Sequence, residues 1–228
     1  MTSFPHSGTG PGSITPDGSP VEFYTLLRPR GEAEIVAQVT PPGGSVLELG
    51  SGVGRVTHAL LERGFEVVAV DESAEMLAHV RGAETVRGRI QDLRLERRFD
   101  AVMLASYLVN TADEDSRRAL LSACARHVAP GGAVLIQWRP PDRHDAQQVG
   151  TGRTDGDITI TLAAREEVGA GLFRSTMRYS HGDRVWTQSF TSRRLGDDDL
   201  RAALAESGLH LDRFLTDDHE WVLAVPAT

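Results

Sequence analysis

Three glycines and two acids in the first third of the chain have the types and spacing that hold a nucleoside ligand. The glycines stand at positions 50, 52 and 54, in the run Glu48-Leu49-Gly50-Ser51-Gly52-Val53-Gly54-Arg55, and Asp71 stands 21 residues after Gly50. Glycines let a ligand approach the backbone, and the N–H groups at the start of a following helix point toward it. A carboxylate about 20 residues further on suits a pair of ribose hydroxyls. The pattern predicts a nucleoside-cofactor site.

The flanking residues supply the elements that would position this loop. Residues 45–49 are a short apolar run typical of a strand, and residues 56–63 carry apolar side chains at helical spacing before Gly64. A second strand over residues 65–70 ends at Asp71. Strand, glycine turn, helix and strand form the first unit of a doubly wound α/β sheet, which binds ligands at the carboxyl ends of its strands.

The spacing of the glycines distinguishes between nucleoside ligands. Dinucleotide-binding loops have the pattern G-x-G-x-x-G, whereas this chain has G-x-G-x-G. Glu48, two residues before Gly50, would repel a pyrophosphate and attract a cation. The pattern E-x-G-x-G-x-G, with a second strand ending in an acid, resembles motif I and its partner in class I S-adenosylmethionine-dependent methyltransferases. The resemblance implies a sulfonium cofactor, S-adenosylmethionine, with its methionine part over the glycine loop and its ribose on Asp71.

Strands and helices continue to alternate after Asp71, which implies a parallel sheet with right-handed crossovers. The expected strands cover residues 85–90, 99–105 and 133–138, and the expected helices begin at Ser73 and Asp113. With Pro-Gly-Gly before the fifth strand, this stretch again resembles the methyltransferase core. The predicted fold class is therefore α/β, a Rossmann-like, doubly wound and mostly parallel sheet.

The C-terminal part has a different pattern. Residues 157–162, 173–179 and 185–191 alternate as antiparallel strands do, and they predict an extension that covers the cofactor and shapes the acceptor pocket. We expect a flexible segment over residues 1–20, rich in Gly, Ser, Thr and Pro. We expect residues 21–228 to form a single methyltransferase domain. Its parts are a core at 42–140, the extension at about 155–192, and a C-terminal helix and strand at 197–226.

Composition narrows the possible partners. The net charge of −8 opposes nonspecific binding to nucleic acid or to an anionic membrane. No apolar run approaches the roughly 18 residues of a membrane span, and the N-terminus lacks a signal-sequence pattern. The single cysteine, Cys124, falls in a helical run as a packing residue. These features predict a cytoplasmic monomer or homodimer without a metal.

The resemblance implies a set of cofactor contacts at the ends of successive strands. The set comprises Tyr24, Glu48, Gly50, Ser51, Gly52, Arg55, Asp71, Glu72, Ser73, Met76, Ile90, Gln91, Asp92, Ala105, Ser106 and Asn110. Met76 either lies against adenine or packs within its helix. Arg55 either binds the cofactor carboxylate or is a solvated helix charge. Because Arg89 stands where the family commonly has an acid, either Asp92 or only backbone groups contact the adenine amine.

The methyl-transfer step requires few specific side chains, so the sequence indicates its catalytic residues only weakly. Methyl transfer from a sulfonium mainly requires that the nucleophile be held at near-attack distance, and a base is needed only if the nucleophile must lose a proton. The catalytic candidates are Tyr24, His144, His219 and Glu220. Tyr24 either contributes a cation–π contact or a hydroxyl, or it packs its helix on the sheet. The acceptor-lining candidates are Tyr107, Gln137, Trp138, Tyr179 and Trp186. Of these, Trp138, Tyr179 and Trp186 either line an aromatic pocket or fill the core of the extension.

The sequence predicts an S-adenosylmethionine-dependent methyltransferase acting on a small molecule, such as an aromatic or amine metabolite in a tailoring pathway. Amino-DNA methyltransferases have (Asn/Asp/Ser)-Pro-Pro-aromatic after the fourth strand, where this chain has Ala105-Ser106-Tyr107-Leu108. A nicotinamide-dependent oxidoreductase is an alternative, disfavoured by the glycine spacing and by Glu48. A non-catalytic, cofactor-binding interaction domain is a third possibility.

Overall fold

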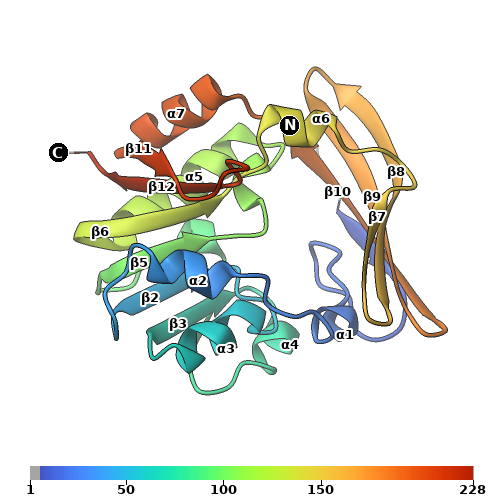
Figure 1. Cartoon of the computed structure of the whole chain (residues 1–228), viewed down its shortest axis with the longest axis horizontal. Helices are drawn as coiled ribbons and strands as arrows, with labels where there is room; N and C mark the ends of the chain where they lie inside the picture. The colour runs from blue at the N-terminus through green and yellow to red at the C-terminus, as the bar shows by residue number, and fades with distance from the viewer. Residues whose placement is uncertain (1–5, 228) are drawn as a thin grey trace.

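Strands that are apolar on both faces build the centre of the molecule, because helices cover both sides of them. The computed structural model describes residues 6–227. Seven strands form one sheet in the order β11-β12-β6-β5-β2-β3-β4, in which β12 runs antiparallel to both of its neighbours and the other pairs are parallel (Figure 1). These strands are β2 (Ser45–Leu49), β3 (Glu66–Asp71), β4 (Glu84–Arg87), β5 (Phe99–Leu104), β6 (Val128–Gln137), β11 (Leu209–Phe214) and β12 (Trp221–Pro226).

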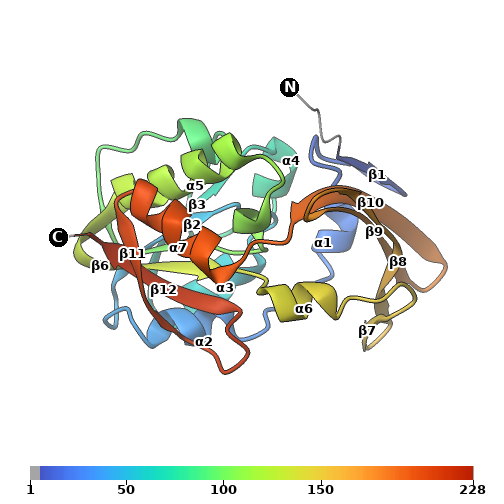
Figure 2. The same cartoon turned by 90° about the horizontal axis from the view of Figure 1, so that it is seen from above.

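Two helical layers cover this sheet. Leu121 of α5 and Leu204 of α7 are buried in one cluster with alternate strand residues such as Leu47, whereas Leu60 of α3 packs in another cluster with Val46. Figure 2 shows α5 and α2 on opposite sides of the sheet. The helices are α1 (Val21–Tyr24), α2 (Glu32–Ala37), α3 (Arg55–Glu62), α4 (Ala74–Leu77), α5 (Glu114–His127), α6 (Pro141–Asp145) and α7 (Asp197–Glu206), with 3-10 turns η1 (Ile90–Asp92) and η2 (Leu108–Asn110).

The antiparallel strands form a sheet of their own. Its order is β1-β10-β9-β8-β7, and all of its neighbouring strands are antiparallel. The strands are β1 (Ser7–Thr9), β7 (Gly152–Asp155), β8 (Ile158–Gly169), β9 (Leu172–His181) and β10 (Arg184–Arg193). This sheet stands beside the first one in Figure 1, with α1 between them. Pro140 and Pro141 follow β6 and start α6, because proline cannot continue a central strand.

Residues 7–20 differ from the predicted flexible segment. Ser7–Thr9 pair with residues 187–189 of β10, and the Trp186 Nε1 group donates to the carbonyl of Pro11 at 2.8 Å. Composition did not reveal this docking, because the interactions depend on β10, about 180 positions away. Residues 1–5 of the predicted segment lie outside the described residues. In the C-terminal part, β11 was also not predicted, since its polar residues at 210, 212 and 213 hide the alternation of an edge strand.

Candidate cofactor and acceptor site

The glycine loop between β2 and α3 has the conformation that its sequence predicts. Gly50, Gly52 and Gly54 have φ values of 78°, 55° and 82°, in the left-handed region that favours glycine. The N–H groups of Gly50 and Ser51 donate to the carbonyl of Val70 at 2.9 Å, which ties the loop to β3. The hydroxyl oxygen of Ser51 is buried and lacks a hydrogen-bond partner among residues 6–227. An unpaired buried hydroxyl in a glycine loop is suited to a polar ligand group.

Asp71 connects this loop to the start of α4. One carboxylate oxygen accepts from the N–H of Gly52 and the other from the N–H of Ser73, both at 2.9 Å. Burial raises the pKa of Asp71 above its ordinary value, and the negative charge of Asp17 adds to this effect against the two N–H donors. Each oxygen keeps a free lone pair, so the carboxylate is held in place while it can still accept from a pair of hydroxyls.

Glu48 lies beneath the loop and is 3% exposed. Its carboxylate accepts a hydrogen bond from the hydroxyl of Thr57 in α3. Burial raises the pKa of Glu48 to about 7, an effect that the Thr57 hydrogen bond and the charge of Arg55 only partly oppose. A buried carboxyl group that is half-ionised near neutral pH would be fully ionised by a nearby cationic ligand.

Tyr24 reaches from α1 to both sheets. Its ring packs with Val53 of the glycine loop and with Met76 of α4, and its hydroxyl donates to Gln188 Oε1 of β10 at 3.2 Å. Burial raises the pKa of Tyr24, so the hydroxyl is a neutral donor. The packing interpretation is therefore supported, because the ring packs α1 against the glycine loop, and the contact of Tyr24 with the cofactor stays a prediction.

The residues expected around adenine lie on both sides of the loop. Ser73 caps α4 by accepting from the N–H of Met76 at 3.1 Å, and Met76 is buried, with its sulfur 3.9 Å from a Cβ placed on Gly52. The Ile90 side chain lies 3.8 Å from a Cβ placed on Gly50. Asp92 is exposed and pairs with Arg89 at 3.6 Å. Glu72 is exposed, and Gln91 is partly exposed.

Two consecutive non-glycine residues, Ser106 and Tyr107, have φ values of 57° directly after β5. This left-handed conformation costs free energy and occurs preferentially at functional sites. The Ser106 N–H donates to Gln137 Oε1 at 2.8 Å, and Leu108 lies 3.0 Å from a Cβ placed on Gly50. The strained loop is therefore held beside the glycine loop, with Ala105 partly exposed at its start.

The Tyr107 side chain is held from two sides. Its hydroxyl donates to Glu220 Oε2 at 2.8 Å, and the guanidinium carbon of Arg139 lies 4.0 Å from the centre of its ring. Burial raises the pKa of Tyr107. Glu220 is anchored by its N–H, which donates to Asp218, while His219 stacks on Phe214 with ring centres 4.1 Å apart. Of the predicted catalytic residues, the structure thus brings Glu220 next to a predicted acceptor residue.

Several predicted site residues have structural partners instead. Arg55 donates from Nη1 to Glu32 at 2.6 Å and to the carbonyl of Arg28, so it is an ion-paired rather than a solvated charge, and its contact with the cofactor carboxylate stays a prediction. Asn110 uses its amide to join the ends of β6 and β10, through the backbones of Arg139 and Arg193. Its predicted cofactor contact is not supported, because both amide atoms are engaged and the side chain is buried.

The two tryptophans proposed to line the acceptor pocket are both fully buried. Trp138 packs in the core under α7, and Trp186 packs with Phe23 and Tyr179 between α1 and the antiparallel sheet. The expectation that Trp138 and Trp186 contact the acceptor is corrected, since neither side chain is open to a ligand. Tyr179 is 6% exposed and donates to Gln188 at 2.8 Å.

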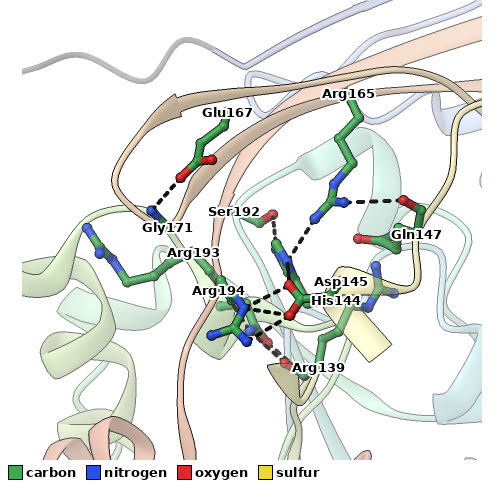
Figure 3. A network of polar contacts seen from close by, with 11 residues as sticks. Arg139, His144, Asp145, Gln147, Arg165, Glu167, Gly171, Ser192, Arg193 and Arg194 are labelled. Carbon is green, nitrogen blue, oxygen red and sulfur yellow. Dashed lines mark hydrogen bonds and ion pairs between the residues drawn. The ribbon is translucent and has the colours of Figure 1, made fainter. Parts of the chain in front are cut away.

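His144 lies in α6 at the joint between the sheets, and it is 1% exposed. Its Nδ1 atom accepts from Arg165 at 2.8 Å, and its ring meets the edge of Phe173. Figure 3 shows Arg165, Ser192 and the Asp145–Arg194 ion pair gathered around it. Burial, and then the charge of Arg165, lower the pKa of His144 to about 4. A buried neutral imidazole positions α6 against the second sheet, which corrects the expectation that it is a general base.

His144→Phe should lower the free energy of unfolding at pH 7. It should also reduce the dependence of this free energy on pH between 4 and 6.5. The folded pKa lies below the unfolded value of about 6.5, so the neutral ring stabilises the fold above pH 6.5 and this stability is lost as pH falls toward 4. At pH 7 the variant leaves Arg165 without this acceptor, a cost of about 1–3 kcal/mol. Urea unfolding between pH 4 and 8 checks this, with the exposed His210→Phe as control. Equal slopes for His144→Phe and wild type would contradict it.

Three further residues near Asp71 and Tyr24 were not predicted from the sequence. The Gln188 amide donates to the Ser19 hydroxyl at 2.9 Å, and that hydroxyl donates to Asp17 at 2.8 Å. This chain of hydrogen bonds joins the N-terminal segment to β10 beside Tyr24. Its only sequence signal was a polar glutamine inside the otherwise alternating strand β10, which predicts a buried polar partner.

Comparisons with known proteins agree with this geometry. Residues 46–132 match the family model described as a methyltransferase domain. A cypemycin N-terminal methyltransferase from a Streptomyces species is 38% identical over 138 residues, which cover 55% of this chain and 56% of that protein. The CcbJ methyltransferase of Streptomyces caelestis has a TM-score of 0.71 at 20% identity, over 92% of this chain and 97% of that one. The sugar N-methyltransferase KedS8 of Streptoalloteichus has a TM-score of 0.69 at 20% identity, over 96% and 98%.

The glycine loop and the strand order define a Rossmann-like α/β fold, as the sequence predicted. The chain is similar to class I S-adenosylmethionine-dependent methyltransferases, through the methyltransferase-domain match over residues 46–132 and the shared fold, and the predicted resemblance is confirmed. The chain spans about half the length of the curated relatives it matches. No helix within residues 6–227 is long and apolar enough to cross a membrane. The same residues contain no group of His, Cys, Asp or Glu placed to hold a metal ion.

Proposed function

We propose that this chain binds S-adenosylmethionine at the carboxyl ends of β2, β3 and β5 and transfers its methyl group to a small molecule. The observation that carries the proposal is the Asp71 carboxylate, which the N–H groups of Gly52 and Ser73 hold at the edge of the glycine loop. The unpaired Ser51 hydroxyl and the raised pKa of Glu48 support a ligand that is both polar and cationic.

Each part of the site would hold one part of this cofactor. Asp71 accepts from the ribose hydroxyls, Met76 and Ile90 flank the base, and Glu48 lies beneath the cationic amino-acid end. When bound, S-adenosylmethionine supplies an electrophilic methyl group on a sulfonium centre. The ring of Tyr24 and the neighbouring polar groups of β10 exclude water from one side of the site.

Tyr107 and Glu220 are suited to handle a proton of the acceptor. The Tyr107 hydroxyl donates to Glu220, so its oxygen keeps a lone pair that can accept an N–H or O–H group. Arg139 against the ring fixes the orientation of the side chain. We propose that this pair orients the nucleophile, and that Glu220 takes the proton that the acceptor loses.

A small amine is the acceptor class that we propose. The net charge of −8 disfavours a nucleic acid. The printed names of two relatives, a cypemycin N-terminal methyltransferase and the sugar N-methyltransferase KedS8, support nitrogen as the nucleophile. We also propose that the protein acts in the cytoplasm, as a monomer or a homodimer.

Calorimetric titration with S-adenosylhomocysteine, beside NADH, tests the cofactor. We expect micromolar binding of S-adenosylhomocysteine and none of NADH. Preference for NADH would instead support an oxidoreductase. A panel of primary and secondary amines with labelled methyl donor then tests the transfer, and saturable cofactor binding without transfer to any extract would favour a non-catalytic domain.

A further inference from the structure

Helix α1 lies between the seven-stranded half of the molecule and the antiparallel sheet (Figure 1). On one side, the ring of Tyr24 packs with Val53 of the glycine loop and with Met76 of α4. On the other side, Phe23 stacks on Tyr179 of β9, with ring centres 4.2 Å apart. Two neighbouring aromatic residues of this short helix therefore contact the two halves of the molecule.

The side chain of Gln188 in β10 holds the Tyr24 hydroxyl from the antiparallel sheet. Its Oε1 atom accepts from Tyr24 at 3.2 Å and from Tyr179 at 2.8 Å, and its Nε2 atom donates to the Ser19 hydroxyl at 2.9 Å. Both lone pairs of the amide oxygen are thereby used. Gln188 is 7% exposed, and burying an amide costs free energy that an apolar side chain on the same strand face, such as Trp186, avoids. The packing of the sheet alone therefore does not account for a glutamine at this position.

Asp17 sets the direction of these hydrogen bonds. An ionised carboxylate can only accept, and one oxygen of Asp17 accepts from the Ser19 hydroxyl at 2.8 Å. Because Ser19 has then given its only proton, its oxygen must accept from Gln188, which turns the NH₂ group of the amide toward Ser19. The amide oxygen is left facing the two tyrosines, and both hydroxyls donate to it. The N-terminal segment thus fixes the orientation of the amide that holds Tyr24.

We propose that Gln188 is a positioning residue that holds the ring of Tyr24 against the glycine loop in the geometry that binds the cofactor. This inference rests on the proposed methyltransferase function and gives the antiparallel sheet and the N-terminal segment a part in cofactor binding. Gln188 acts through Tyr24 and not by contact with the cofactor. A ring that is already fixed loses little rotamer freedom when the ligand binds, which is worth roughly 2- to 10-fold in affinity.

A double-mutant cycle on the affinity for S-adenosylhomocysteine tests this role. Gln188→Leu removes the amide while it keeps an apolar side chain of similar size, and Tyr24→Phe removes the hydroxyl that the amide holds. We expect each variant to weaken binding roughly 2- to 10-fold, because the ring must then be ordered by the ligand. The double variant should bind as the weaker single variant does, since both changes break the same hydrogen bond. Calorimetric titration gives the four affinities.

Ser189→Ala is the matched control. Ser189 is the next residue of β10 and faces the other side of the sheet, where its hydroxyl lies 2.8 Å from that of Thr176. The control therefore also loses a side-chain hydrogen bond of the antiparallel sheet, but one that does not reach Tyr24. Its affinity for S-adenosylhomocysteine should equal that of wild type even if its free energy of unfolding falls.

Hydrogen exchange gives a readout of the coupling that does not depend on the affinities. The N–H of Ser19 donates to the Thr15 hydroxyl and the N–H of Val21 to the carbonyl of Ser13, so both report on the N-terminal segment. Saturation with S-adenosylhomocysteine should slow their exchange in wild type, because a coupling between two sites acts in both directions. In Gln188→Leu this slowing should be lost.

The outcomes separate the role of Gln188 from the function on which it rests. Normal affinity in Gln188→Leu, or losses that add in the double variant, would overturn the positioning role alone. If Gln188→Leu does not fold, Ser19→Ala takes its place, since it keeps the glutamine but lets the amide turn over. Ser19→Ala should then weaken binding in wild type and not in Tyr24→Phe, and equal losses in both would overturn the role. Failure of wild type to bind S-adenosylhomocysteine would overturn the proposed function and this inference with it.

Discussion

Asp71→Ala should weaken the binding of S-adenosylhomocysteine by about 1–3 kcal/mol, or roughly 5- to 150-fold, with little change in the fold of the sheet. The variant removes the proposed acceptor of both ribose hydroxyls. It also removes the two carboxylate oxygens that hold the N–H groups of Gly52 and Ser73, so the glycine loop loses its link to the start of α4. Loss of a ligand contact and loss of preorganisation act in the same direction.

Asp71→Asn separates these two effects. Its amide oxygen can still accept from one of the two N–H groups, but its NH₂ group cannot accept from the other or from a hydroxyl. We therefore expect an affinity between those of wild type and Asp71→Ala. Asp212→Ala, on the exposed strand β11, is the matched control and should bind as wild type does. Calorimetric titration gives the affinities, and an Asp71→Ala variant that binds normally would sink the ribose assignment.

The sequence predicted the parallel half of the fold because its signals are local. The run before Gly50, the glycine spacing and the acid that ends β3 each lie within a few residues of the element they define. The same holds for the helix caps, where Ser73 and Asp113 accept from backbone N–H groups three residues later. Local patterns of this kind fix which strand ends meet at one edge, and so they also predicted the position of Asp71.

Local sequence patterns did not predict how the antiparallel sheet and the N-terminal segment pair with distant residues. Alternation predicted the strands β8 to β10, but not that they form a separate sheet, since strand pairing depends on contacts between distant residues. Likewise, the Ser19–Gln188 hydrogen bond spans 169 positions. The roles of His144, Trp138 and Trp186 were misassigned for the same reason, because burial decides whether a polar or aromatic residue can contact a ligand.

Glu48→Gln should make the cofactor-free protein more stable than wild type above pH 7. The folded pKa of about 7 is above the ordinary value of 4.5, so the protonated carboxyl group favours the fold. That stability is fully present below pH 4.5 and is lost as pH rises through 7. The difference between the two values corresponds to about 3 kcal/mol. Glutamine stays neutral and can still accept from Thr57, so the variant avoids this loss.

Two measurements check the role of Glu48. Urea unfolding of the cofactor-free protein between pH 4 and 8 should show equal pH dependence of the two proteins below pH 4.5, and a stability difference that grows between pH 4.5 and 7, with the exposed Glu66→Gln as matched control. Titration with S-adenosylhomocysteine near pH 6.5, in buffers of different ionisation enthalpy, should show proton release for wild type and less for the variant, because the ammonium group of the ligand favours the ionised form of Glu48. The variant should also bind more weakly. If Glu48→Gln were less stable than wild type at every pH, the buried carboxyl group would be ionised and better stabilised than its burial indicates.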